Sequence, residues 1–267
     1  MKNRPAEPLG LPEPQGLSAR AIRSFLEEGG LRLDVRVYDQ VGSTNSLAKE
    51  AAGEGQSVLI AARSQTEGRG RRGRSFFSPP DAGLYFSLSL DWGREEPPVL
   101  VTTMAAVAVA RVLEERTGIR AGIKWVNDLY WEGRKICGIL TEGVSQAGKN
   151  GFQSLVVGIG LNLTRPQEDY PQEIRDKAGA IGDRAGALDR NQLIALIARE
   201  LLQIVQGLPD RSYLEDYRAR CFMLGRPVRL ETGEMIVPYG ISDDGALLYL
   251  EGGEIRALHS GQVSIQP

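Results

Sequence analysis

The chain of 267 residues has a formal net charge of −2, so it has no overall electrostatic attraction to nucleic acid. Its two cysteines, Cys137 and Cys221, lie far apart and match neither a disulfide framework nor a zinc motif, which favours a reducing compartment. The single histidine, His259, excludes an H-E-x-x-H metal site, and no Walker-type phosphate loop of the form G-x-x-x-x-G-K-[ST] occurs.

The first thirty residues predict an arm followed by one short helix. Four prolines lie within the first sixteen residues and favour an extended conformation. Apolar residues recur at helical spacing over Leu17–Glu28, and Gly29-Gly30 would end that helix. The N-terminus lacks the layout of a signal peptide, and the longest apolar run, Met104–Ala110, is far shorter than the roughly 20 residues that span a bilayer. We therefore expect a cytoplasmic protein without a membrane segment.

From Leu31 onward, predicted strands alternate with predicted helices. The strands are Leu33–Tyr38, Ser57–Ala62, a half-buried strand through Leu84, Phe86, Leu88 and Leu90, and then Gly122–Val126, Ile136–Val144 and Leu155–Leu163. The helices run from the Ser43-Thr44-Asn45 turn to about Ala52, over Thr102–Thr117 and over Asn191–Gln206. A turn at Asn127–Gly133 would join two of the strands. This order predicts an α+β domain.

Beyond Gly225 the pattern changes to short strands joined by tight turns. They are Pro227–Glu231, Met235–Ile241, Ala246–Leu250, Glu254–Ala257 and Gln262–Ile265. Five short strands without a helix predict a small barrel of SH3-like size. We therefore expect three parts: residues 1–30 as an arm with a short helix, residues 31–220 as a catalytic domain, and residues 221–267 as the barrel.

The most informative segment is rich in arginine and glycine. Between Arg63 and Arg74 there are five arginines and one glutamate, interspersed with three glycines. Glycine lets backbone N–H groups approach an anion, and guanidinium groups pair with phosphate and carboxylate oxygens. A nucleic-acid-binding or merely solvated basic run is the alternative. The position between two buried strands, inside a domain, favours a small-molecule site.

Two further segments carry polar residues or glycines within apolar strands. Lys124–Asp128 and Gly133–Leu140 have a lysine at each edge, which could equally be a surface charge that protects a strand. Val156–Leu163 contains Gly158-x-Gly160, but Leu163 stands where a dinucleotide-binding motif needs its third glycine. Glycine in a strand still lets a ligand lie against the backbone.

Five segments together resemble the biotin–protein ligases in order and spacing. They are Ser43-Thr44-Asn45, Gly68–Arg74, Lys124–Asp128, Arg134–Leu140 and Gly158–Asn162, while Gly225–Val228 and Ser260–Ser264 are similar to that family's small barrel. The resemblance begins at about Leu31. It implies a mixed, largely antiparallel sheet with flanking helices, as in class II aminoacyl-tRNA synthetases, plus the C-terminal SH3-like β-barrel. About 30 residues precede it, too few for the winged helix of the family's repressors, so we expect no DNA binding.

The resemblance also implies substrates and site residues. The enzyme would activate biotin with ATP and Mg²⁺ to biotinyl-5′-AMP and transfer it to a lysine of a biotin carboxyl carrier protein. Biotin would be bound by Ser43, Thr44, Asn45, Gln65, Arg69, Gly70, Arg71, Lys135 and Gly138. ATP would be bound by Arg71, Arg72, Phe76, Asn127, Lys135 and Asn162. The catalytic residues would be Arg69, Arg71 and Lys135, and no residue is assigned to a metal.

The sequence departs from the family's pattern at two positions. Phe76 stands where many members carry tryptophan, which keeps a ring for stacking on adenine but removes an N–H donor. Gln266 stands where some relatives carry arginine, so no nucleotide contact is assigned to the barrel. Neither departure changes the expected reaction.

The expected chemistry explains how an enzyme can work with one histidine. Biotin's carboxylate, with a pKa near 4–5, is ionised at pH 7 and needs no general base to attack phosphorus. Cations and backbone N–H groups would stabilise the charge that develops on the phosphate. The attacking lysine must lose a proton in the second step, and the sequence names no base for it. Two other functions remain open, a lipoate–protein ligase and a non-enzymatic nucleic-acid-binding protein, as does assembly into a homodimer.

Overall fold

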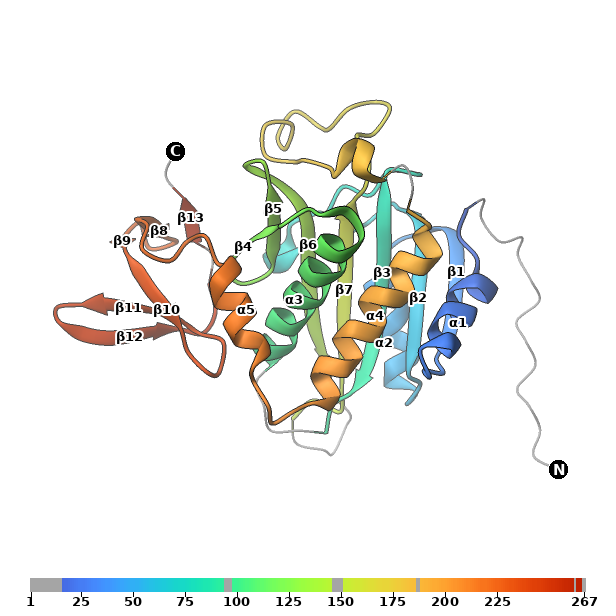
Figure 1. Ribbon diagram of the computed structural model, residues 1–267, viewed down its shortest axis with the longest axis horizontal. Helices are drawn as coiled ribbons and strands as arrows, with labels where there is room; N and C mark the ends of the chain where they lie inside the picture. Colours follow the sequence, from blue (N-terminus) through green and yellow to red (C-terminus); the bar gives the residue numbers. More distant parts are fainter. Residues whose placement is uncertain (1–15, 94–97, 146–150, 186–187, 262, 266–267) are drawn as a thin grey trace.

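The computed structural model describes residues 16–93, 98–145, 151–185, 188–261 and 263–265 (Figure 1). The proline-rich arm Pro5–Pro14 and Gln266, about which the sequence raises expectations, lie outside the described residues. The body of the protein is one seven-stranded sheet in the order β1-β2-β3-β7-β6-β5-β4. Its strands are β1 (Asp34–Val41), β2 (Val58–Gln65), β3 (Gly83–Asp91), β4 (Gly122–Lys124), β5 (Asp128–Trp131), β6 (Arg134–Val144) and β7 (Ser154–Asn162).

The pairing of these strands confirms a mixed, largely antiparallel sheet. β1 and β2 are parallel, and every other neighbouring pair in this sheet is antiparallel. The helix α2 (Thr44–Gly53) connects β1 to β2, as a parallel pair requires a crossover. The crossover brings the start of α2 to the strand ends of β1 and β2, where polar residues gather.

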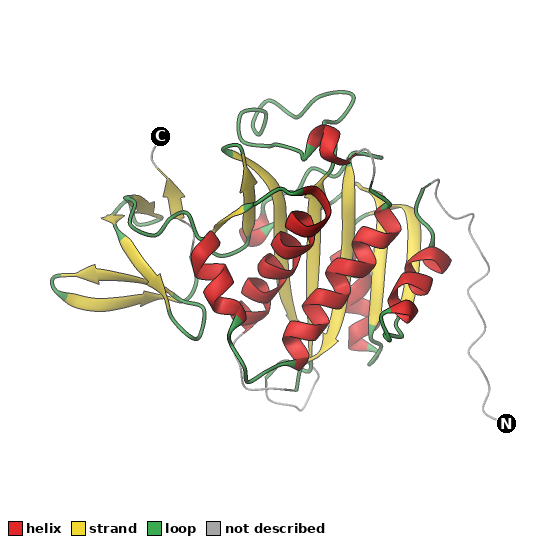
Figure 2. Ribbon diagram, in the orientation of Figure 1, coloured by secondary structure: helices red, strands yellow, loops and turns green. Residues whose placement is uncertain are grey.

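Helices cover both faces of the sheet (Figures 1 and 2). The helices α1 (Ala19–Glu28), α3 (Pro98–Thr117) and α4 (Arg190–Gln206) pack on one face, and α2 packs on the other. No helix in the described part of the chain is both long enough and apolar enough to cross a bilayer.

The double cover makes one prediction wrong. The strand through Leu84 and Leu90 was expected to be half-buried, but Tyr85, Ser87 and Ser89 on its other face are also buried. The reason is that α2 lies over this second face, a neighbour that the alternation within one strand does not reveal. The buried serines therefore face a protein interior rather than water.

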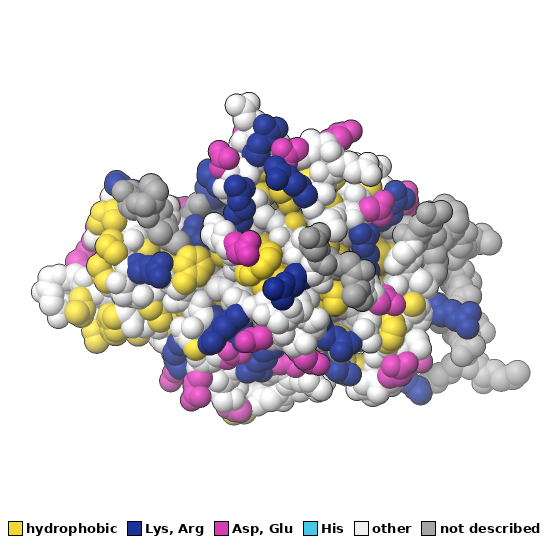
Figure 3. Space-filling view, turned by 45° about the horizontal axis from the view of Figure 1, so that its top comes forward, with side chains coloured by type: hydrophobic (Ala, Val, Ile, Leu, Met, Phe, Trp, Pro, Cys, Tyr) yellow, Lys and Arg dark blue, Asp and Glu magenta, His cyan; other side chains and the backbone are white. Residues whose placement is uncertain are grey.

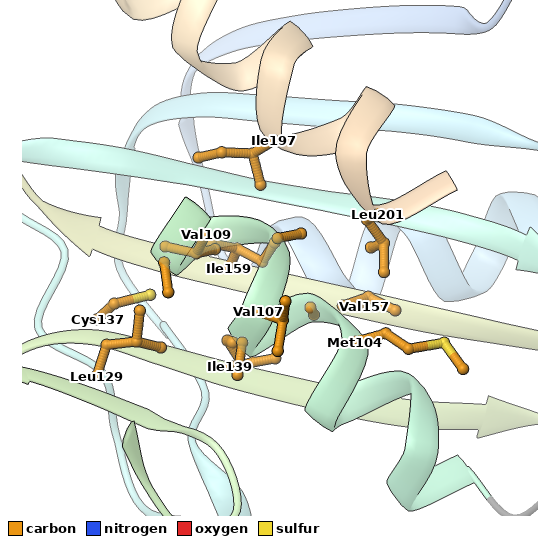
Figure 4. Close-up of a cluster of buried hydrophobic side chains, with 14 of the residues drawn as sticks. Met104, Val107, Val109, Leu129, Cys137, Ile139, Val157, Ile159, Ile197 and Leu201 are labelled. Carbon is orange, nitrogen blue, oxygen red and sulfur yellow. The ribbon is translucent and has the colours of Figure 1, made fainter. Parts of the chain in front are cut away.

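The main core lies between the sheet and helices α3 and α4 (Figure 4). Met104 and Val107 of α3 lie among Ile139 of β6, Val157 of β7 and Leu201 of α4. The helix α3 is buried along most of its length, and its many alanines and valines allow close approach on several sides. Helix α3 therefore lies at the centre of the packed layers.

Two elements differ from what the sequence predicts. The expected turn Asn127–Gly133 contains β5, and the tight turn is confined to Glu132 and Gly133, whose φ angles are 49° and 74°. The helix α5 (Tyr213–Arg220) was not predicted, because half of its residues are charged and it has no clear apolar face. Its Arg220 is nonetheless buried, with ion pairs to Glu114 and Asp216 that tie α5 to α3 and to itself.

The C-terminal strands form two small sheets, in agreement with a barrel-like domain. One has the order β10-β11-β12 and the other β13-β8-β9. The strands are β8 (Val228–Leu230), β9 (Met235–Ile236), β10 (Pro238–Ile241), β11 (Leu247–Glu251), β12 (Glu254–Leu258) and β13 (Val263–Ile265). The single strand expected over Met235–Ile241 is thus two strands. Several exposed hydrophobic side chains gather at this end of the molecule (Figure 3), among them Leu250 and Ile255.

Candidate active site

Two adjoining cavities lie on the face of the sheet that also carries α2. The first, here the neutral chamber, is lined by Ser43, Thr44, Asn45, Gln65, Arg69, Phe76, Gly138, Leu140, Gly158, Ile159 and Gly160. The second, here the cationic chamber, is lined by Arg69, Gly70, Arg71, Arg72, Arg74, Ser75, Phe76, Lys124, Trp125, Asn127, Asp128, Lys135, Gly138, Ile139, Leu140, Gly261 and Val263. Arg69, Phe76, Gly138 and Leu140 belong to both, so a molecule in one chamber can meet a molecule in the other.

The first turn of α2 supplies the polar wall of the neutral chamber. The backbone N–H and the hydroxyl of Thr44 both lie within hydrogen-bonding distance of Gln65 Oε1, at 2.9 and 3.1 Å. The Nε2 of Gln65 donates to Ser78 Oγ at 2.8 Å. These bonds fix which end of the Gln65 amide faces which neighbour. The wall is therefore rigid and uncharged, and it is suited to a neutral polar ligand group.

Asn45 shapes the same chamber with an amide that is fully engaged by protein. Its Oδ1 accepts from Ser87 Oγ at 2.6 Å, and its Nδ2 donates to the Leu140 carbonyl at 3.3 Å and to Glu142 Oε2 at 3.0 Å. A Cβ atom at Gly158 would lie 2.0 Å from Asn45 Oδ1, so only glycine fits there. Asn45 is thus a wall of the chamber whose orientation is set from behind.

Phe76 separates the two chambers at the point where they meet. Its ring lies over Gly138 and Gly160, which face each other in the β6–β7 register, and a Cβ at Gly160 would lie 2.4 Å from the ring. The ring centroid is 5.9 Å from Lys135 Nζ, a cation–π distance. The two glycines therefore make the room that an aromatic ring needs against the sheet.

Six cationic side chains and one carboxylate line the cationic chamber. Lys135 Nζ lies 2.6 Å from Asp128 Oδ1, and Arg71 Nη1 donates to Asn127 Oδ1 at 3.2 Å. Burial lowers the pKa of the Arg71 guanidinium from its usual value, while Asp128 opposes this change. Burial likewise lowers the pKa of the Lys124 ammonium, and Asp128 again opposes it. Such an excess of positive charge suits a ligand with several negative charges.

The loop that carries the arginines folds back on itself between β2 and β3. Arg69 and Ser75 form an isolated bridge, and Arg71–Gly73 is a short 3₁₀ turn. Arg72 has a φ angle of 57°, in the left-handed region. Its guanidinium forms an ion pair with Glu231, which lies between β8 and β9 of the C-terminal sheets. The loop is therefore connected to the C-terminal part of the chain.

The C-terminal sheets also reach the site directly. Gly261 and Val263 line the cationic chamber, a contribution that the sequence did not reveal. Trp125 Nε1 donates to the Gly245 carbonyl at 2.9 Å, which fixes these sheets to the segment between β4 and β5. The cationic chamber is thus lined by residues of the large sheet and its loops and by residues of the C-terminal part of the chain.

The structure brings nearly all the residues singled out from the sequence into these two chambers. Ser43, Thr44, Asn45 and Gln65 lie in the neutral chamber alone, and Gly70, Arg71, Arg72, Asn127 and Lys135 lie in the cationic chamber alone. Arg69, Phe76 and Gly138 lie at the junction. Asn162 lines neither chamber, and its Nδ2 donates to the Gly179 carbonyl at 2.8 Å. Its contact with a nucleotide stays a prediction.

Sequence reasoning missed three polar residues behind the neutral chamber. Ser87 is fully buried beneath Thr44 and Asn45, and Glu142 forms a salt bridge of 2.9 Å with Lys49. A serine at the centre of a strand made mostly of apolar residues was the available signal for Ser87. Nothing local marks Glu142, because its partners lie 93 and 97 positions away along the chain.

Comparisons with known proteins find relatives over most of the chain. The Biotin/lipoate A/B protein ligase family matches residues 38–162, and the Biotin protein ligase C terminal domain matches residues 223–265. The chain is 32% identical to the bifunctional ligase/repressor BirA of Escherichia coli, over 98% of this chain and 82% of that protein. It is 32% identical to a biotin–[acetyl-CoA-carboxylase] ligase of Mycobacterium tuberculosis, over 92% of this chain and 95% of that one.

A solved structure shows the same fold. The biotin protein ligase from Aquifex aeolicus in complex with biotin and ATP superposes with a TM-score of 0.71 at 29% sequence identity. The match covers 86% of this chain and 97% of that one. The likeness therefore extends over most of both chains.

Proposed function

This chain belongs to the Biotin/lipoate A/B protein ligase family, and from that premise we propose that it activates biotin with ATP and joins it to a lysine of a carrier protein. The observation that carries the proposal is the junction of a neutral chamber with a cationic one. Biotin has an uncharged ureido head and a charged carboxylate at the end of its chain. The head would lie in the neutral chamber, with the carboxylate at Arg69 beside the ATP phosphates.

In the first step, a biotin carboxylate oxygen would attack the α-phosphorus of ATP. A carboxylate–phosphorus bond forms, the bond to the bridging oxygen breaks, and pyrophosphate leaves with that electron pair. The carboxylate is already ionised, so no proton has to be removed. Lys135 and Arg71 would stabilise the charge on the phosphate oxygens, and Arg69 would hold the carboxylate close to phosphorus.

In the second step, the carrier lysine would attack the carbonyl carbon of biotinyl-5′-AMP. An amide bond forms, the bond between the carbonyl carbon and the phosphate oxygen breaks, AMP leaves with that electron pair, and the proton of the amine is released to solvent. The mixed anhydride is reactive, so the enzyme must mainly position the amine and keep water away. The loop between β2 and β3 that carries Arg69, Arg71 and Arg72, here the arginine loop, would close over the adenylate. Phe76 would stack on adenine.

The residues of the cationic chamber fit a magnesium ion that arrives with ATP. Mg²⁺ commonly binds substrate phosphates together with one or two carboxylates. Asp128 is the one carboxylate in the lining of this chamber and would be the protein ligand. The ion would neutralise part of the charge on the leaving pyrophosphate. Among the described residues no cluster of three or more His, Cys, Asp or Glu side chains suits a protein-held metal.

The remaining expectations concern partners and organisation. The acceptor would be a biotin carboxyl carrier protein, as the name of the Mycobacterium tuberculosis relative suggests for that enzyme. We propose a cytoplasmic protein without DNA binding, in which residues 31–220 form the catalytic domain and residues 221–267 the barrel. Whether it forms a homodimer is measured by sedimentation with and without biotin and ATP.

The decisive test supplies the whole reaction. Purified protein is incubated with labelled biotin, ATP, Mg²⁺ and a carrier domain, and both pyrophosphate and labelled carrier are measured. We expect both products, and we expect a chelator of Mg²⁺ to abolish them. Lipoate in place of biotin should give neither, because a dithiolane ring uses few of the hydrogen-bonding groups around Thr44 and Gln65. Pyrophosphate release with lipoate but not with biotin would point to the related lipoate ligases instead.

The glycine beneath Phe76 yields a prediction about both substrates. In Gly160→Ala, the new Cβ would displace the ring, which borders both chambers. We expect the KM values for biotin and for ATP each to rise about tenfold, the size of effect of a small steric misplacement. Gly53→Ala is the control, because nothing lies within 4 Å of a Cβ there. Unchanged KM values in Gly160→Ala would mean that Phe76 does not define the substrate positions.

A further inference from the structure

We infer that Glu142 is a positioning residue, one that sets the hydrogen-bond polarity of the neutral chamber through Asn45 and Ser87. The inference rests on the proposed function, since it assumes that this chamber receives the ureido head of biotin. Glu142 itself lies outside the lining of both chambers. It lies on β6, two residues beyond Leu140, which lines them both.

The carboxylate of Glu142 is held in its charged form. It accepts from Lys49 Nζ at 2.9 Å and from Asn45 Nδ2 at 3.0 Å, and its side chain is 23% exposed. Burial alone would raise the pKa of this carboxyl, but the hydrogen bonds from Lys49 and Asn45, together with the positive charges of Lys49 and Arg69, outweigh burial and the pKa lies below its usual range. A charged carboxylate has no proton to donate and is only an acceptor.

Because the Glu142 carboxylate can only accept hydrogen bonds, it determines how the Asn45 amide is oriented. The amide must turn its NH₂ group toward Glu142, and its Oδ1 therefore faces Ser87. Ser87 has one hydroxyl proton and two oxygen neighbours, Asn45 Oδ1 at 2.6 Å and Thr44 Oγ1 at 2.8 Å. Since Asn45 presents an acceptor, the proton of Ser87 goes to Asn45. Toward Thr44, Ser87 then offers only lone pairs.

The consequence reaches the chamber at Thr44. The hydroxyl proton of Thr44 is directed to the protein side, where Gln65 Oε1 accepts it at 3.1 Å. A lone pair of Thr44 Oγ1 then remains for a ligand N–H, the group that a ureido ring presents. If Asn45 were reversed, its NH₂ would face Ser87, and Ser87 would donate to Thr44 and occupy one of the two lone pairs of Thr44 Oγ1, so that a ligand N–H would find one acceptor position in place of two. The charge on Glu142 thus keeps both lone pairs of Thr44 Oγ1 available in a chamber that Glu142 does not touch.

A graded set of variants tests the idea by calorimetric titration with biotin alone. In Glu142→Leu, Asn45 loses its acceptor, and we expect the biotin Kd to rise about tenfold, the effect of an unmade hydrogen bond to a charged group. In Glu142→Gln an acceptor remains but either amide orientation is allowed, and a rise of about threefold is expected. Lys49→Met keeps the carboxylate and should stay within about twofold.

Steady-state kinetics separate positioning from a general loss of structure. In Glu142→Leu the KM for biotin should rise with the Kd, while the KM for ATP and kcat at saturating biotin change less than about twofold. A rise of both KM values together would overturn the inference, as would a biotin Kd in Glu142→Leu within about twofold of wild type. Should Glu142→Leu not fold, Glu142→Gln decides by the same two criteria, because it preserves shape.

A double-mutant cycle asks whether the effect passes through Ser87. In the Ser87→Ala background the hydrogen-bond chain from Asn45 to Thr44 is already broken. Glu142→Leu should therefore raise the biotin Kd less than about twofold in that background. A full tenfold cost in that background would show a different route and would contradict the inference. Wild-type protein that releases no pyrophosphate from biotin and ATP would instead refute the proposed function, so the two failures are distinguishable.

Discussion

Replacing Lys135 by alanine should slow pyrophosphate release by about a thousandfold at saturating biotin and ATP, the upper range for removing one preorganised charge stabiliser. The ammonium lines the cationic chamber, lies 2.6 Å from Asp128 and is 5.9 Å from the Phe76 ring. In the proposed reaction it would stabilise negative charge that develops on the phosphate oxygens only as phosphorus is attacked. Biotin binding, followed by calorimetry, should therefore change less than about threefold.

The matched control for this variant is Lys177→Ala. Lys177 is exposed and close enough for its charge to act on Lys124, but it does not line either chamber. We expect its pyrophosphate release to stay within about twofold of wild type, as for a screened surface charge. A Lys135→Ala enzyme with normal turnover and weakened biotin binding would assign the lysine to substrate binding rather than to the chemical step.

Replacing Arg71 by alanine should lower adenylate formation by about a hundredfold and speed the escape of the adenylate. The guanidinium is half-buried, which strengthens its pairing with a phosphate oxygen, and it is held by Asn127 at 3.2 Å. Formation is measured in single-turnover experiments. Escape is measured as the fraction of biotinyl-5′-AMP that stays with the protein during gel filtration.

Two companion variants define what Arg71 contributes. Arg71→Lys keeps the charge but not the fork of donors, and it should recover formation more fully than retention. Arg165→Ala removes an exposed arginine that pairs with Asp169 and should leave both measurements unchanged. Wild-type retention of the adenylate in Arg71→Ala would contradict the role of the loop as a cover.

Local patterns in the sequence predicted most of the sheet, and their errors have physical causes. The alternation of apolar and polar residues along β3 suggested one buried face and one exposed face. It could not show that α2 covers the second face, where Ser87 and Ser89 lie. The strand β5 lies within a segment that contains typical turn residues, so the sequence predicted a turn there. Its pairing with β4 and β6 became evident only from the structure. The charged helix α5 is held by ion pairs and burial that sequence periodicity does not register.

The site was predictable where residues of one function are contiguous. Ser43-Thr44-Asn45 and the arginine loop are short runs, and the structure brings both runs into the chambers. Residues that act through the sheet register were not predictable. Ser87 lies opposite Gly158 in the β3–β7 register, and Glu142 reaches Asn45 only because β6 passes beneath the start of α2. The amide of Asn162 is taken by Gly179, a partner in a long loop.

The links from the C-terminal sheets to the catalytic part set a condition for exchanging modules between ligases. Trp125 needs a carbonyl oxygen where Gly245 provides one, and Arg72 needs an anion where Glu231 provides one. A transplanted segment covering residues 223–265 would have to reproduce both, or else leave an indole and a guanidinium without their counterparts. Arg218 of α5 adds two more links, to the Ile241 carbonyl and to Asp243, so compatibility of a chimera should depend on matching these few contacts more than on overall similarity between donor and recipient.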